Sequence, residues 1–170
     1  MKKNGFAGIF LFLLVLQILI CNYFHVTPYV MLSILPVMVL CIPARISTPV
    51  TMIIAFAAGL TVDMLSEGVA GINTLALVPV AFLRLNIVSL VFGEDLLARK
   101  EDFSVRKNGI GKVSLALILV QALFLLIYIW ADGAGTRPFW FNAARFGASL
   151  SAGYVVSLLL IDVLAPDTRK

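Results

Sequence analysis

The stretch "GLTVDMLSEGVAGIN", from Gly59 to Asn73, places a carboxylate between two apolar segments. About ten mostly hydrophobic residues flank it on each side, so Asp63 stands where lipid or protein interior is expected. A charged group in such a position is costly unless it has a partner, water or a route to the membrane surface. The first question that the sequence raises is therefore what Asp63 binds.

The composition predicts that lipid is the solvent for most of the chain. Hydrophobic residues make up 61% of the 170 residues and charged residues 13%, whereas a soluble domain is about half apolar and about a quarter charged. The charges cluster between long apolar runs, as in an integral membrane protein. The net charge of +4 is explained by topology, so no nucleic-acid partner is expected.

The sequence shows no set of residues typical of an enzyme. It has one histidine, no Cys/His cluster, no phosphate-binding glycine loop and no nucleophile motif. Cys21 and Cys41 lie inside apolar runs, where they are expected to act as small hydrophobic residues rather than as a disulfide. We therefore expect a protein without catalytic activity, cofactor or metal.

Six segments qualify as spanning helices, which need roughly 20 mostly apolar residues. The second is the weakest, because it is short and contains Pro36. Lys2 and Lys3 before the first segment could also mark a signal peptide, but the apolar run is longer than about 15 residues and no small-residue cleavage site follows. The predicted fold is an all-α bundle of six transmembrane helices in one domain, residues 1–170, with spans at 6–24, 28–42, 49–65, 70–92, 113–131 and 142–165.

The distribution of Lys and Arg predicts the orientation of this bundle. With the N-terminus inside, Arg137 is the one basic residue in an outer loop, and ten basic residues fall on the cytoplasmic side. Cytoplasmic loops carry the excess of Lys and Arg, so both termini are expected to be cytoplasmic (N-in, C-in). The ten residues are Lys2, Lys3, Arg45, Arg99, Lys100, Arg106, Lys107, Lys112, Arg169 and Lys170.

The longest polar segment is "GEDLLARKEDFSVRKNGIGK", residues 93–112, and is expected to be a cytoplasmic loop. It is either a solvated connector that carries the topology signal or a contact for anionic lipid headgroups or a cytoplasmic partner. In the second case Phe103 would be a membrane anchor.

Four ionisable residues fall within or at the ends of the predicted spans: Asp63, Arg84, Arg145 and Asp162. At a rise of about 1.5 Å per residue, Asp63 and Arg145 both lie within roughly 5 Å of the outer helix ends, whereas Arg84 lies about 21 Å down its helix. Asp162 is near the inner end of its helix. The favoured internal pair is therefore Asp63 with Arg145. A pair of Asp63 with Arg84 would need marked tilt, a long reach or a kink at Pro79, and the remaining alternative is that Asp63 and Arg145 reach outer water independently.

Small residues have two expected uses. The sixth segment carries the rows Ala143/Gly147/Ser151 and Ser149/Gly153/Ser157, which allow close helix contact in lipid and predict packing within the chain or, less favoured, a subunit interface. Gly68 and Gly71 suit a tight outer connection, after which Asn73 is placed to cap the fourth helix.

Two runs of the sequence resemble the MreD family of rod shape-determining membrane proteins, especially its Bacteroidetes-type members. They are "QILICNYFHVTPYVMLSILPV" and "AFAAGLTVDMLSEGVAGINTLALVPVAFLR", in the first half of the chain. The matching elements are the Gly59-x-x-x-Asp63 step, Gly71 followed by Asn73, and the apolar helix that ends near Arg84. The second half matches only in hydropathy, and the Glu67-Gly68-Val69-Ala70 step lacks the proline that the family often has before the glycine.

The resemblance implies a non-enzymatic component of the cell-elongation machinery in the bacterial inner membrane. Family members work with the bitopic protein MreC and, through it, with MreB, the glycosyltransferase RodA and a class B penicillin-binding protein in peptidoglycan synthesis. The resemblance also implies a compact bundle similar to the substrate-binding subunits of vitamin transporters. The structural or partner-binding candidates are Gly59, Asp63, Gly71, Asn73, Arg84 and Arg145.

Two classes of function therefore compete. In the first, the chain is a membrane scaffold that binds a partner's transmembrane helix and supports rod shape. In the second, it is a small-molecule-binding subunit of a vitamin transporter, with Asp63, Asn73 and Arg145 lining an outward pocket. The sequence offers few polar groups deep in the membrane and no evident inverted repeat, which favours the scaffold.

Overall fold

The computed structural model describes residues 3–23, 30–44, 46–67, 71–93, 109–133 and 137–164. These residues form α-helices, one π-helix and connecting segments, with no strand among them. The elements are α1 (Lys3–Tyr23), α2 (Leu35–Leu40), α3 (Thr48–Val62), the π-helix η1 (Asp63–Glu67), α4 (Ile72–Phe92), α7 (Ile110–Gly133) and α8 (Phe139–Leu164).

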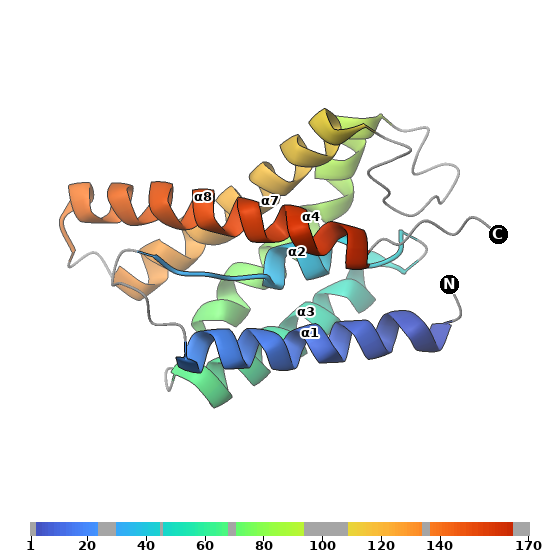
Figure 1. Ribbon diagram of the computed structural model, residues 1–170, viewed down its shortest axis with the longest axis horizontal. Coiled ribbons are helices and arrows are strands. Elements are labelled where there is room, and N and C mark those ends of the chain that lie inside the picture. The colour runs from blue at the N-terminus through green and yellow to red at the C-terminus, as the bar shows by residue number, and fades with distance from the viewer. Residues whose placement is uncertain are drawn as a thin grey trace.

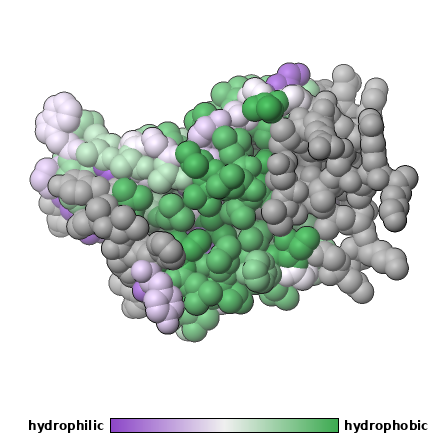
Figure 2. Space-filling view, in the orientation of Figure 1, coloured by the Kyte–Doolittle hydropathy of each residue, from purple (hydrophilic) through white to green (hydrophobic). Residues whose placement is uncertain are grey.

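Five helical stretches are long and apolar enough to cross a membrane: Phe6–Tyr23, Thr48–Ser66, Ile72–Phe92, Ile110–Gly133 and Phe139–Ile161. The first turn of α1 and the last turn of α8 lie at the same end of the bundle (Figure 1). Hydrophobic residues cover the middle of the face shown in Figure 2. The described chain is therefore compatible with an all-α, multi-pass membrane protein, as predicted.

The second predicted spanning helix, residues 28–42, is wrong. Of its described residues, 30–42, residues 31–34 have no regular structure and the only helix is α2, with six residues. Pro36 lies in the first turn of α2, where its missing N–H leaves no hydrogen bond unmade. The same proline further inside a helix would break it, which explains why a hydropathy pattern alone does not produce a continuous helix here.

The discontinuous segment, as we call residues 30–42, nevertheless runs along the bundle between the same two ends as the long helices (Figure 1). Every residue of α2 is buried. Ile34 is also fully buried, at 0% exposed. This segment, half without regular structure and half helical, lies in the middle of the protein and is not among the five stretches long and apolar enough to cross a membrane.

The long helices differ in how deeply they lie in the bundle. Half of the membrane-length window of α7 is buried inside the protein, compared with 11% for α1 and 22% for α8. We therefore place α7 at the centre, with α1 and α8 at the periphery. The side chains that face outward on these two helices are available to lipid or to a partner.

The two small-residue rows of α8 face in different directions. Ser149, Gly153 and Ser157 are buried, and a Cβ built on Gly153 would lie 2.4 Å from Nε2 of Gln121 on α7. This row packs within the chain, as predicted. The other row, Ala143/Gly147/Ser151, is exposed, and a Cβ on Gly147 would meet no atom within 4 Å.

The predicted boundaries of the other spans are close to the observed ones. The largest change is that α7 begins at Ile110 and ends at Gly133, so that it includes three residues before and two after the predicted fifth span. The predicted loop 93–112 is therefore shorter than expected, and its residues 94–108 lie outside the described part of the chain. Of the ten basic residues that carry the topology signal, four lie in residues 94–108 and eight in all lie outside the described part of the chain.

Candidate functional site

The carboxylate of Asp63 lies at the start of α4. Asp63 is the first residue of η1, directly after α3, and is 0% exposed. Its Oδ1 accepts hydrogen bonds from the backbone N–H of Asn73 (2.9 Å) and from the Asn73 side-chain amide (3.0 Å). Its Oδ2 accepts from the N–H groups of Gly71 (3.0 Å) and Thr74 (3.1 Å) and from the Thr74 hydroxyl (2.8 Å).

These contacts explain why a charge is tolerated at this position. The first N–H groups of a helix have no partner within the helix, and its N-terminus carries partial positive charge. The Asp63 carboxylate, at the end of α3, accepts hydrogen bonds from these N–H groups of α4 and puts a negative group beside the positive end of that helix. Gly71, the residue before α4, has a φ of 105°, a conformation that favours glycine.

The motif around Asp63 therefore joins α3 to α4. Gly59 packs directly against the first turn of α4: a Cβ built on it would lie only 2.7 Å from the Thr74 Cα atom. The structure brings four of the predicted site residues together here, namely Gly59, Asp63, Gly71 and Asn73. Asn73 donates to Asp63, so the prediction that Asn73 itself caps α4 is wrong.

The predicted ion pair between Asp63 and Arg145 is also wrong. The Arg145 guanidinium on α8 instead binds Oδ2 of Asp132, near the end of α7. Arg137 binds the same oxygen at 2.7 Å. The sequence prediction ended the fifth span at residue 131 and so overlooked Asp132, which the longer α7 places beside α8.

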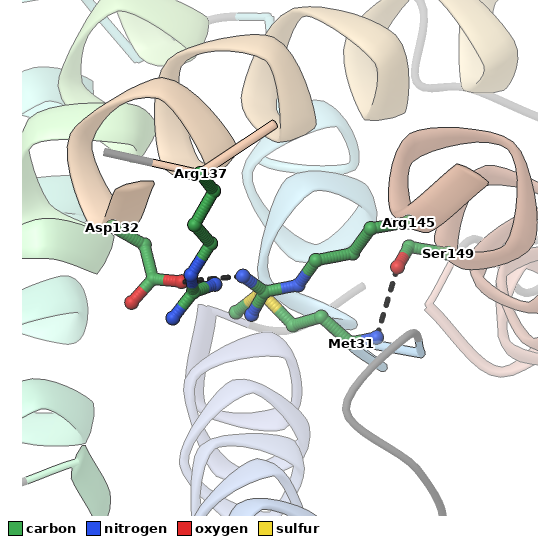
Figure 3. A network of polar contacts seen from close by, with 5 residues as sticks. All are labelled: Met31, Asp132, Arg137, Arg145 and Ser149. Atoms are coloured by element: carbon green, nitrogen blue, oxygen red, sulfur yellow. Dashed lines mark hydrogen bonds and ion pairs between the residues drawn. The ribbon is translucent and has the colours of Figure 1, made fainter. Parts of the chain in front are cut away.

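The resulting cluster of Asp132, Arg137 and Arg145 is shown in Figure 3, and we call it the outer cluster after the side on which the predicted orientation would place it. Both guanidinium groups point toward the single carboxylate. The side chains of Arg145 and Asp132 are 11% and 22% exposed, and that of Arg137 is 39% exposed. The guanidinium carbon of Arg145 also lies 5.9 Å from the Tyr128 ring centre, within the range of a cation–π contact.

Arg84 occupies a separate place inside the bundle. It is 1% exposed, and its guanidinium donates to the backbone carbonyls of Val39, at 3.5 Å, and Ile42. The carbonyls at the end of a helix have no partner within that helix. Arg84 thus satisfies the C-terminal end of α2, and the structure places it with neither Asp63 nor the outer cluster.

Gln17 on α1 holds the extended part of the discontinuous segment. Its Oε1 accepts from the N–H of Ile34 at 2.8 Å, and its Nε2 donates to the carbonyl of Leu32 at 3.3 Å. Gln17 is 0% exposed. One amide side chain therefore supplies both a donor and an acceptor to backbone that has no helical partners.

Two further side chains complete this support. Gln121 on α7 donates from Nε2 to the carbonyl of Ser33 at 3.4 Å. Ser149 on α8 accepts from the N–H of Met31 at 2.9 Å, one helical turn along from Arg145 (Figure 3). The sequence analysis named Ser149 as a packing residue and missed its hydrogen bond, and it missed Gln17 and Gln121 altogether, although they are the only glutamines in the chain and each interrupts an apolar run.

Comparison of the chain with models of protein families, with curated proteins and with solved structures found no match in any of the three. The polar contacts themselves are therefore the basis for a functional proposal. In the described segments, Asp63, Arg84, Gln17 and Ser149 bind backbone groups of the chain itself. The side chain of Asp162, the fourth predicted intramembrane charge, lies outside the described residues.

Ser149→Ala should destabilise the protein, while Ser151→Ala should not. The first change leaves the Met31 N–H without its hydroxyl acceptor, at a cost of about 1 kcal/mol. The second removes a hydroxyl on the exposed face that bonds only the Gly147 carbonyl of its own helix. Thermal unfolding of both variants in the same detergent tests this, and equal melting temperatures would contradict the support that Ser149 gives.

Double-mutant cycles should separate Asp63 from the outer cluster. The effects of Asp63→Ala and Arg145→Ala on unfolding should add to within about 0.5 kcal/mol, because the two side chains share no partner. Asp132→Ala and Arg145→Ala should instead be strongly non-additive, since each change alone removes the same ion pair. A coupling energy between Asp63 and Arg145 larger than that between Asp132 and Arg145 would instead support an Asp63–Arg145 ion pair, which the structure does not show.

Proposed function

We propose that this chain is a non-enzymatic scaffold of the bacterial cell-elongation machinery, located in the inner membrane. In this proposal it binds the transmembrane helix of an MreC-like bitopic protein and so supports peptidoglycan synthesis and rod shape. The contact with MreB, RodA and a class B penicillin-binding protein would be indirect. The support from sequence is the resemblance to the MreD family over residues 17–37 and 55–84.

The observation that carries the proposal is that the residues of this resemblance bind one another rather than face an open site. Gly59, Asp63, Gly71 and Asn73 form one contact unit that fixes α4 against α3. A substrate-binding subunit needs polar groups that are offered to a ligand. A motif whose carboxylate accepts five hydrogen bonds from its own chain instead supports a role in setting the shape of the bundle.

The outward row of α8 supports a helix as the partner. Ala143, Gly147 and Ser151 are exposed along one face, and small residues permit close approach of a second helix in lipid. Because the inward row of the same helix is already used against α7, the two faces of α8 have different roles. The partner helix in this proposal lies along the exposed face.

Cysteine crosslinking tests the partner and its location together. In a chain whose Cys21 and Cys41 are replaced, Ser151→Cys should form a disulfide with a cysteine placed in the MreC-like helix. Ser157→Cys, on the buried face at 1% exposed, should not. Depletion of the chain should also widen and shorten cells.

The assignment to the elongation machinery fails if depletion leaves width and length unchanged and no bitopic partner is captured. Capture of the partner with equal yield from both cysteines would instead reject the α8 face while keeping the function. A co-purifying vitamin or energy-coupling ATPase would favour the transporter subunit.

We also propose the N-in, C-in orientation, which is supported by the excess of Lys and Arg on one side. A cysteine introduced at Gly135 should react with a membrane-impermeant thiol reagent in intact spheroplasts, and one at Ser104 should react only after lysis. The reverse pattern of labelling would invert the orientation. Reaction of both positions before lysis would show that the spheroplasts leak, and the assay would then be repeated with sealed vesicles.

A further inference from the structure

The outer cluster contains more positive than negative charge. Asp132 supplies one carboxylate, and both Arg137 and Arg145 bind its Oδ2 atom. Two guanidinium groups facing one carboxylate leave one positive charge without a counter-charge inside the cluster. An arginine remains protonated at any physiological pH, so this excess does not disappear by titration.

The two arginines are not equally accessible. Arg145 is 11% exposed, and its Nε atom is buried without a hydrogen-bond partner in the described structure. Arg137 is 39% exposed and lies across the Phe141 ring, with its guanidinium carbon 5.7 Å from the ring centre. The excess charge is therefore accessible at Arg137.

Exposed aromatic residues lie close to Arg137 in the sequence, at the end of α7 and the start of α8. Phe139 and Trp140 begin α8 and are 76% and 81% exposed, and Trp130, two residues before Asp132, is 74% exposed. Tryptophan and other aromatic residues gather at the level of lipid headgroups, where one part of the ring meets acyl chains and the other meets water. If these aromatic side chains lie at that level, the Arg137 guanidinium lies near the headgroup phosphates.

We propose that Arg137 binds the phosphate of an anionic phospholipid at this end of the bundle. A guanidinium presents a planar fork of N–H donors that matches phosphate oxygens, and a net negative headgroup supplies the missing counter-charge. Asp132 fixes the Arg137 Nη1 atom, so that the side chain is oriented before the lipid arrives. Phe139 and Trp140 hold the acyl-chain side of the same lipid.

Native mass spectrometry of the full-length chain tests the proposal. The protein is mixed with phosphatidylglycerol and phosphatidylcholine, and the amount of each lipid that stays bound is measured. The wild-type chain should retain phosphatidylglycerol about fivefold better, which is the effect expected of one basic residue near an anionic surface. Arg137→Gln should remove this preference, and Arg137→Lys should keep part of it, because the charge remains without the planar fork. Lys112→Gln, at the exposed start of α7, is the matched loss of one charge and should keep the preference.

Several results would overturn the site. The first is that the wild-type chain does not prefer phosphatidylglycerol, and the second is that the preference survives Arg137→Gln. The third is that Lys112→Gln loses the preference to the same extent, which would indicate an effect of net charge alone. Soluble glycerol phosphate at millimolar concentration should not displace the lipid, since it lacks acyl chains for the aromatic residues. Full displacement of the lipid by glycerol phosphate would instead indicate that Arg137 binds a soluble phosphate.

Discussion

Inside lipid, backbone N–H and C=O groups that are not in a helix must find partners within the protein, because neither water nor acyl chains can supply them. The discontinuous segment creates this requirement in the middle of the bundle. Four of the long helices each contribute one polar side chain to it: Gln17 from α1, Arg84 from α4, Gln121 from α7 and Ser149 from α8. The bundle is thus tied together through one segment that has no regular structure of its own along half its length.

The same requirement explains Asp63. The first turn of α4 presents N–H groups that its own helix does not use, and the carboxylate at the end of α3 accepts them. Asp63 and Arg84 are therefore a complementary pair in function, although they do not touch. Asp63 accepts hydrogen bonds from N–H groups at the start of α4, and Arg84 donates to carbonyls at the end of α2. Neither side chain needs a partner of opposite charge.

The sequence predicts the class of protein and most helix positions, because length and hydropathy determine which segments cross a bilayer. It does not predict the shape of residues 28–42, since hydropathy is the same for a helix and for a buried extended segment, and only Pro36 indicates a break. The Asp63–Arg145 prediction failed for a related reason. Matching depths of two charges does not account for the N–H groups of α4, which are closer in sequence to Asp63 and need an acceptor.

The polar residues that were missed, Gln17, Gln121 and Asp132, had no assigned partner in the sequence. A single amide in an apolar helix has many possible uses, and only the position of the discontinuous segment shows that Gln17 and Gln121 bind backbone. The predicted fifth span stopped before Asp132, because a prediction from hydropathy ends a helix where charged residues begin. The structure extends α7 past it, since Arg137 and Arg145 neutralise the carboxylate.

The two faces of α8 connect the surface of the bundle to this internal support. Ser151 lies on the outward face, while Ser149, two residues earlier, binds the N–H of Met31 from the inward face. One turn before Ser149, Arg145 joins the same helix to α7 through Asp132. A partner helix that packs on the exposed row would therefore press on the element that holds both the discontinuous segment and the end of α7. Because α8 lies at the periphery of the bundle, the hydrogen bond to Met31 and the ion pair with Asp132 are the contacts through which a change in its position would reach the core.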